Sequence, residues 1–140
     1  MKNTTHLIIT VPSGIYYEGD VEIVTLKTAT GYMGIQPNIS PIFSSIEIGT
    51  LTIGWNNSDN SEKYYIGGGL VYAENKKINI ITDDIIKVSE IDILRAQKEK
   101  EELEKIISQS NKDNVDITKL ETKLKKTLYR IESYNFMNNK

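Results

Sequence analysis

Short apolar runs separated by turn residues fill the first part of the chain. The runs are rich in Ile, Val, Thr and Tyr, which favour strands, and we expect strands over 6–11, 21–28, 45–53, 63–66, 70–73 and 77–82. Several runs carry apolar residues at consecutive positions, whereas a strand buried on one face alternates apolar and polar residues. The pattern therefore predicts a sheet that curls or is covered on both sides, as in a β-sandwich or a flattened barrel.

A helical pattern follows the strands. The segment 89–108 contains no Gly or Pro and predicts a first helix, residues 108–116 read as a turn, and residues 117–136 predict a second helix. Two helices of about 20 residues joined by a short polar turn favour an antiparallel hairpin.

These two patterns together predict an α+β fold. An N-terminal β-sandwich (a flattened barrel) is expected over residues 1–84, and a C-terminal antiparallel two-helix hairpin over residues 85–140. The middle of the first helix, residues 97–102, offers almost nothing apolar to bury. We therefore expect the hairpin to be held weakly and to be able to move.

The second predicted helix has two separate faces. At about 100° per residue, one stripe is apolar and the other, roughly 120° away, is basic. The apolar stripe consists of Ile117, Leu120, Leu124, Leu128, Ile131 and Tyr134. The basic stripe consists of Lys119, Lys123, Lys126 and Arg130. This basic stripe is either a solvated face or a contact for an acidic protein surface.

Composition narrows the classes of function. The chain has 140 residues, of which 39% are hydrophobic and 26% charged, as in a soluble domain with or without an appendage. A net charge of −2 argues against binding nucleic acid through bulk phosphate neutralisation. The absence of Cys removes disulfides, thiol nucleophiles and thiolate metal sites. No run resembles a signal peptide or a membrane span, so we expect no direct membrane insertion.

Two Gly-rich segments are candidate binding sites. Gly67-Gly68-Gly69 could cradle a phosphate, but such loops need a following helix, and a predicted strand follows here. A tight crossing or bulge is the favoured interpretation. The segment 31–41, predicted as a loop fixed by two Gly and two Pro, is either a shaped connection or a binding surface. Its apolar side chains are Tyr32, Met33, Ile35 and Ile39.

No constellation of catalytic or metal-binding residues is present in the sequence. His6 is the only histidine, and with no Cys and no suitably clustered carboxylates a metal site is not expected. His6 is not paired with a Ser in any nucleophile motif, and Asp83 and Asp84 are interpreted as solvated. We therefore predict that the chain is not an enzyme.

The stretch SEIDILRA, residues 89–96, begins the first predicted helix. Ser89 followed three residues later by Asp92 resembles a capping box, and Asp92 also favours the positive end of a helix. Asp92 and Arg95 are spaced to form a surface pair. A helix cap is a sufficient explanation of this stretch.

The order of elements and the motifs resemble those of the ε subunit of the rotary F-type ATP synthase, called δ in mitochondria, over residues 6–96. The segment IITVPSGIYYEGDVEIVTLKTATGYMGIQP, residues 8–37, is similar to the opening of that family. Gly68-Gly69-Leu70 followed by AENKKINIITDD is similar to its Gly-Gly segment and final strand. Ile91-Asp92-x-x-Arg95-Ala96 matches a motif with which members bind ATP.

This resemblance implies a non-catalytic stalk subunit. The sandwich would dock on the γ subunit and the c-ring and help to couple rotation, and the hairpin would switch between a folded and an extended form. In the extended form the basic face would approach an acidic segment of a β subunit and inhibit ATP hydrolysis. Regulatory ATP, the one ligand implied, would favour the folded form. Its expected site residues are Ile91, Asp92, Arg95, Ala96, Lys126 and Arg130.

The resemblance also implies a place in the cell and leaves alternatives. The chain would lie at the cytoplasmic face of the cell membrane as a peripheral part of a complex. Ile39 stands where the family usually carries His. Ile86 stands where ATP-binding members use Glu, and Glu102 stands where such members use Arg. The alternatives are a structural subunit of a divergent F-type-like ATPase that does not synthesise ATP, a free-standing nucleotide-sensing module and, more distantly, a small β-sandwich hydrolase.

Overall fold

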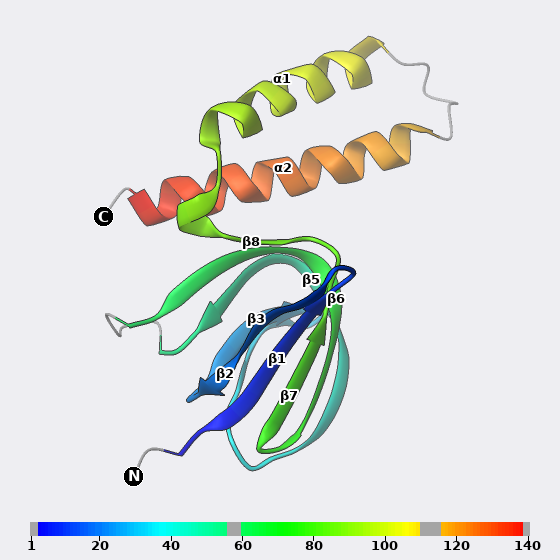
Figure 1. The fold of residues 1–140 in the computed structure, drawn as a ribbon. Coiled ribbons are helices and arrows are strands. Elements are labelled where there is room, and N and C mark those ends of the chain that lie inside the picture. The colour runs from blue at the N-terminus through cyan, green and yellow to red at the C-terminus, as the bar shows by residue number, and fades with distance from the viewer. Residues whose placement is uncertain (1–2, 56–59, 110–115, 139–140) are drawn as a thin grey trace. The chain divides into compact units, whose positions relative to one another are not determined.

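The computed structural model describes residues 3–55, 60–109 and 116–138. It divides the chain into two compact units, Met1–Lys87 and Val88–Lys140, each of which is described by itself. The strands of the first unit are β1 (Thr5–Val11), β2 (Gly14–Val21), β3 (Val24–Thr28), β4 (Gly31–Ile35), β5 (Ile39–Ile53), β6 (Glu62–Asn75), β7 (Lys77–Ile81) and β8 (Ile85–Lys87) (Figure 1).

The strands of the first unit form one continuous sheet that folds over itself. Its order is β2-β1-β7-β6-β5-β3-β4, with β8 paired to β6 away from this path. The long strand β6 pairs with β8 through Tyr64–Ile66 and with β7 through Leu70–Glu74. Because the partner changes along one strand, β6 and its neighbour β5 belong to both layers of a β-sandwich. This confirms the predicted fold class.

The core of the sandwich lies between the two layers. Leu7 and Ile9 of β1 and Ile78 and Ile80 of β7 point inward at alternate positions, as a strand period of two requires. The rest of the buried cluster consists of Val21, Val24, Leu26, Ile35, Ile46, Leu51, Ile53, Tyr64, Ile66, Val71 and Ala73. These side chains come from seven of the strands, so the core ties the folded sheet together.

The sequence pattern missed three strands of the sandwich: β2, β4 and the short β8. β2 was not expected because its side chains are mostly exposed and it carries only an edge pairing with β1. β4 was not expected because its two Gly suggested a loop, yet Gly31–Ile35 pairs residue by residue with β3. The prediction that 31–41 forms one loop is therefore wrong, since only a short turn at residues 36–38 separates β4 from β5. Asn38 makes this turn with a positive φ of 64°.

The three consecutive Gly mark the point where β6 changes partner. A Cβ on Gly69 would lie 2.4 Å from the carbonyl oxygen of Ile81, and one on Gly67 would collide with the carboxylate of Asp84. The Thr82 hydroxyl donates to the Gly68 carbonyl over 2.6 Å, and the Gly67 N–H donates to the Asp84 carbonyl over 2.8 Å. The interpretation as a tight crossing is confirmed, because a side chain here would separate the two chain segments.

The structure moves the predicted start of the helical part by a few residues. Ile85–Lys87 forms β8 and pairs with Tyr64–Ile66, so these residues belong to the sandwich unit rather than to a segment beginning at 85. The short run IIK is too brief for its strand character to be read from the sequence. The first compact unit accordingly ends at Lys87 rather than at Asp84.

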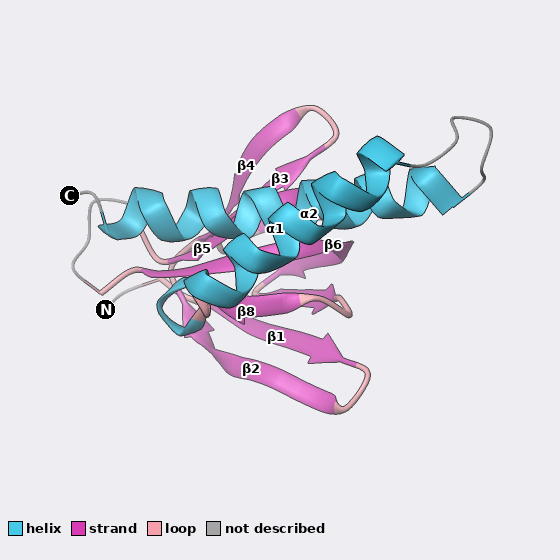
Figure 2. Ribbon diagram, turned by 90° about the horizontal axis from the view of Figure 1, so that it is seen from above, coloured by secondary structure: helices cyan, strands magenta, loops and turns pink. Residues whose placement is uncertain are grey.

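The second unit contains the two expected helices. A 3₁₀ turn, η1 (Val88–Glu90), precedes α1 (Ile93–Gln109), and α2 (Asp116–Asn138) follows. The turn expected at 108–116 lies mostly outside the described residues. The helices run alongside one another in Figure 1, α1 crosses over α2 in the view of Figure 2, and residues of the two helices contact each other, which confirms the predicted hairpin. None of the described helices is long and apolar enough to cross a membrane.

Candidate functional site

Asp92 begins α1 as its N-cap. Its carboxylate Oδ1 accepts a hydrogen bond from the backbone N–H of Arg95 over 3.1 Å, and its carbonyl accepts from Ala96 N–H over 3.0 Å. The prediction that Ser89 caps the helix is therefore wrong. Ser89 lies in η1, and Asp92 itself is the cap. Ile91 and Ala96 are buried on either side of this cap.

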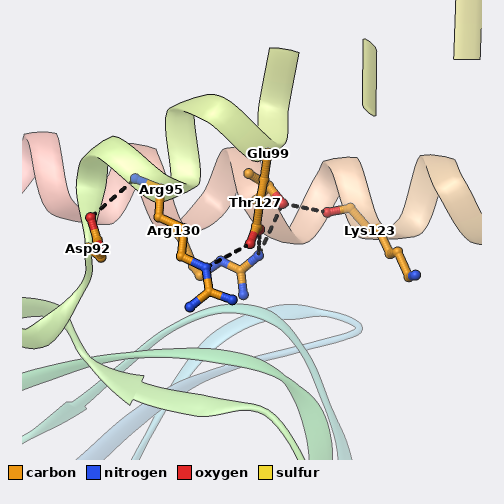
Figure 3. A network of polar contacts seen from close by, with 6 residues as sticks. All are labelled: Asp92, Arg95, Glu99, Lys123, Thr127 and Arg130. Carbon is orange, nitrogen blue, oxygen red and sulfur yellow. Dashed lines mark hydrogen bonds and ion pairs between the residues drawn. The ribbon is translucent and has the colours of Figure 1, made fainter. Parts of the chain in front are cut away.

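A carboxylate of α1 bridges two arginines, one from each helix (Figure 3). Glu99 Oε1 lies 3.5 Å from Nε of Arg95, one turn earlier in α1, and Glu99 Oε2 lies 3.5 Å from Nη2 of Arg130 in α2. Nη2 of Arg130 also donates to the Thr127 hydroxyl over 3.0 Å. That hydroxyl is buried and donates to the Lys123 carbonyl over 2.9 Å. Arg130 is thus fixed by partners on both helices.

A hollow of about 400 Å³ lies between α1 and α2 beside this network. Its lining combines carboxylates, cations and a few apolar groups. The lining residues are Glu99, Glu102, Leu103, Ile106, Lys123, Lys126, Thr127 and Arg130. Guanidinium and ammonium groups at the edge of a concave surface are suited to phosphate or carboxylate ligands. The hollow is therefore a candidate site for an anionic ligand, and the two carboxylates of its lining would repel one.

The structure brings together part of the predicted nucleotide site. Lys126 and Arg130 line the hollow, and Glu99 links Arg95 to Arg130. The basic stripe divides, since Lys123, Lys126 and Arg130 line the hollow and Lys119 does not. Sequence reasoning missed Glu99. Its spacing from Arg95 was a usable signal for the pair within α1, whereas the contact with Arg130 depends on how the two helices pack.

The predicted binding residues of the segment 31–41 are placed differently from what was expected. Tyr32 is exposed, but Ile35 is fully buried at 0% exposure in the sandwich core, so it cannot form part of a surface. Met33 and Ile39 are partly buried and pack against the same core. Of the four side chains, Tyr32 alone presents a large exposed apolar surface, and its hydroxyl accepts from the Thr50 N–H over 3.4 Å.

One outer face of the sandwich carries an apolar patch that the sequence did not reveal. Phe43 is 72% exposed, and its ring lies 6.4 Å from that of Tyr72, its register partner on β6. Leu70 and Ile81 are also register partners and also exposed. Ile15 continues the row on β2 through Thr10, the partner of both Ile81 and Ile15. Recognising this patch requires the strand register, which composition does not provide.

His6 lies on β1 between two carboxylates of β2. Its Nδ1 is 2.9 Å from Asp20 Oδ1, and its Nε2 is 2.9 Å from Glu18 Oε2. The hydrogen bond to Asp20, followed by that to Glu18, raises the pKa of the imidazole above its usual value. His6 is partly exposed. In the described residues, no group of three or more His, Cys, Asp or Glu is arranged to hold a metal ion.

Known proteins place this fold in a family. The protein-family model for the ATP synthase delta/epsilon chain β-sandwich domain matches residues 4–88, which is more than half of the chain. This chain belongs to the ATP synthase delta/epsilon family. Its β-sandwich is the domain described by the family model, and the match ends beside Lys87, where the first compact unit also ends.

Relatives of this delta/epsilon family member match nearly the whole chain. It is 43% identical to the ATP synthase epsilon chain of Mycoplasmopsis synoviae over 92% of this chain and 93% of that one. It is 40% identical to the ATP synthase epsilon chain of Mycoplasma mobile over 96% and 95% of the two chains. A chain of the Euglena gracilis mitochondrial ATP synthase (OSCP/F1/c-ring) has the same fold, with a TM-score of 0.75, 21% identity, and coverage of 96% and 81%.

Proposed function

We propose that this chain is a non-catalytic epsilon-type subunit of the central stalk of a rotary F-type ATP synthase. The observation that carries the proposal is 43% identity over 92% of the chain to a protein named ATP synthase epsilon chain. The fold adds support, because a similar chain occurs in a Tetrahymena thermophila structure titled as ATP synthase central stalk and c-ring, with a TM-score of 0.61. As part of such a complex the chain would be peripheral, at the cytoplasmic face of the cell membrane.

The sandwich would dock on the γ subunit and the c-ring and so help to couple their rotation. We assign the patch formed by Phe43, Tyr72, Leu70, Ile81 and Ile15 to γ. A contiguous exposed apolar face indicates a protein interface, and a contact that transmits torque must be stable. Tyr32, which is exposed on a different strand pair, remains a candidate for a second contact.

Binding to γ tests this assignment. The double variant Phe43→Ser/Ile81→Ser should bind immobilised γ subunit at least about tenfold more weakly, because it removes two large apolar side chains from an interface. Tyr32→Ser is the matched control and should retain binding to γ. Equal binding by the wild type and the double variant would remove the assignment, and a loss confined to Tyr32→Ser would move the γ contact to β4.

The hairpin would regulate ATP hydrolysis by opening. In the closed hairpin Lys123, Lys126 and Arg130 line the hollow beside α1 and Lys119 does not, and of these four Lys126 and Arg130 are the partly buried ones. Extension of the hairpin would make the whole basic stripe available to an acidic segment of a β subunit, where complementary charge would hold it and slow hydrolysis.

Truncation after Lys87 tests this inhibitory role. The shortened chain keeps β8 and should still bind γ, while the reconstituted enzyme should hydrolyse ATP faster than with the full chain. Unchanged hydrolysis together with normal binding to γ would remove the inhibitory role and leave the stalk role intact.

ATP would bind to the hairpin and favour its closed form. Asp92, Arg95, Lys126 and Arg130 supply polar groups, and the buried Ile91 and Ala96 hold the start of α1 beside them. Calorimetry of the full chain with millimolar ATP tests this. Saturable heat that Arg130→Gln abolishes is the expected result. No heat would leave Asp92 as a helix cap and Arg95 as half of a surface ion pair.

A further inference from the structure

The two oxygens of the Glu99 carboxylate are used by two different guanidinium groups. Oε1 faces Arg95 Nε and Oε2 faces Arg130 Nη2, each over 3.5 Å (Figure 3). A carboxylate held between two arginines presents anionic oxygens to both guanidinium groups, as a phosphate group held by the same pair would. In this hairpin, therefore, a side chain of the protein already occupies the place between the arginines.

The surroundings of Glu99 contain cations that would attract an anionic ligand and carboxylates that would repel it. Arg130 is only 26% exposed and is oriented by the Thr127 hydroxyl, so its guanidinium is held ready for an acceptor. Lys123 and Lys126 line the adjoining hollow, and Glu102 lies on the same lining as a second carboxylate. Three cations in the lining thus face two carboxylates, and Glu99 is in contact with Arg130.

We propose that Glu99 is an internal counter-ion that occupies the phosphate position of this hairpin and lowers its affinity for polyphosphates. The inference rests on the proposed nucleotide site and specifies how that site is regulated. A polyphosphate that enters must displace the Glu99 carboxylate from Arg95 and Arg130 or lie beside it, and both alternatives weaken binding through lost contacts or like-charge repulsion.

The charge of Glu99 should affect triphosphate affinity more than it affects the stability of the hairpin, and this makes the proposal testable. Exposed ion pairs contribute little to folding, and the Glu99 side chain is 41% exposed, so neutralising it should leave the hairpin folded. A triphosphate carries several charges, so removing one nearby negative charge changes its affinity more than it changes the fold. We expect Glu99→Gln to raise triphosphate affinity by several-fold to about tenfold at low ionic strength, and by less at high salt.

The experiment compares full-length wild type, Glu99→Gln and Glu101→Gln by calorimetry with inorganic triphosphate at about 20 mM and about 300 mM salt. Glu101 is an exposed residue of the same helix and is not part of the lining, so its variant makes the same change in net charge away from the hollow. Tighter binding by Glu99→Gln and not by Glu101→Gln supports the proposal. Addition of Arg130→Gln to Glu99→Gln should abolish the gain.

Several outcomes would overturn the proposal. Equal affinity of Glu99→Gln and wild type would do so, as would no binding by Glu99→Gln or an equal gain in Glu101→Gln. The same titrations with ATP separate this inference from the proposed function. If Glu99→Gln binds triphosphate more tightly but no variant binds ATP, the nucleotide function fails and the role of Glu99 stands. If all variants bind ATP equally, the nucleotide function stands and the role of Glu99 fails.

Discussion

The sandwich and the hairpin are stabilised by different kinds of contact. The sandwich has a continuous apolar core that reaches from Leu7 of β1 to Ile80 of β7. In the described part of the second unit, the buried residues are Val88, Ile91, Ala96 and Thr127, of which the last two are small. One contact between α1 and α2 is polar and joins Arg130 to Glu99. Because apolar burial is the dominant stabilising term, we expect the sandwich to be the more stable unit and the hairpin to open more easily.

The largest expected effect comes from the sandwich core. Leu26→Ala removes a fully buried side chain and should lower the free energy of unfolding by about 2–5 kcal/mol. Leu128→Ala, at an exposed position of α2, should cost under about 1 kcal/mol. Denaturant titrations followed by Trp55, the only Trp and a residue of the sandwich unit, measure the first, and helical circular dichroism measures the second. Equal costs at the two positions would contradict the contrast between the units.

The crossing on β6 should be nearly as sensitive as the core. Gly69→Ala places a Cβ against the carbonyl oxygen of Ile81, which is backbone and cannot rotate away. We expect a loss of about 2–3 kcal/mol by the same Trp55 titration, a cost typical of overpacking. Gly19→Ala is the matched control, because a Cβ there would meet only the flexible side chain of Tyr17. A loss at Gly69 no greater than that at Gly19 would show that the two segments can separate freely.

The start of α1 should show a smaller effect. Asp92→Ala removes the side-chain acceptor of the Arg95 N–H and should cost about 1 kcal/mol of helix stability, seen as lower helical circular dichroism on mild heating. Asp92→Asn keeps an acceptor and should recover most of this loss. If Asp92→Asn is as damaging as Asp92→Ala, the carboxylate charge rather than the cap holds this end of the helix.

Much of the sandwich could be predicted because its buried strands are locally apolar. Runs such as 6–11 and 77–82 carry enough Ile and Val to identify strands without knowledge of their partners. β2 and β4 escaped because an exposed edge strand and a Gly-rich strand lack that signal, and their conformation depends on pairing with β1 and β3. Ile35 was misplaced for the same reason, since its burial follows from the register of β4.

The candidate site could be predicted only in its local part. The sequence placed Asp92 at the start of a helix and Arg95 beside it, because both depend on spacing within one element. The bridge from Glu99 to Arg130 joins residues 31 positions apart and depends on how the two helices pack. That Lys123, Lys126 and Arg130 line the hollow and Lys119 does not has the same origin.

The smallest expected effect is the pH dependence of stability that His6 gives to the sandwich. This stability is lost as the pH rises, whereas the stability contributed by paired carboxylates is usually lost as the pH falls. Each ring nitrogen of His6 lies 2.9 Å from a carboxylate oxygen, of Asp20 and of Glu18, and both nitrogens can donate at once only when the imidazole is protonated. Its pKa is therefore raised in the folded state above the ordinary value of about 6.5, chiefly by the hydrogen bond to Asp20. The folded state holds this proton more tightly than the unfolded chain does. The stabilisation is complete below pH of about 6.5 and is lost as the pH rises through the folded-state pKa.

Paired unfolding curves at pH 6 and pH 8.5 measure this difference. The wild-type sandwich should lose a small part of its stability at the higher pH, whereas His6→Gln should lose less because it carries no titrating ring. Glu18→Gln/Asp20→Asn is the matched control, since it keeps His6 but removes the acceptors that raise its pKa. If the stabilities of the wild type and His6→Gln change equally between the two pH values, the contacts of His6 with Glu18 and Asp20 do not favour the protonated ring. Such an effect should be absent from the hairpin, whose described residues contain no histidine.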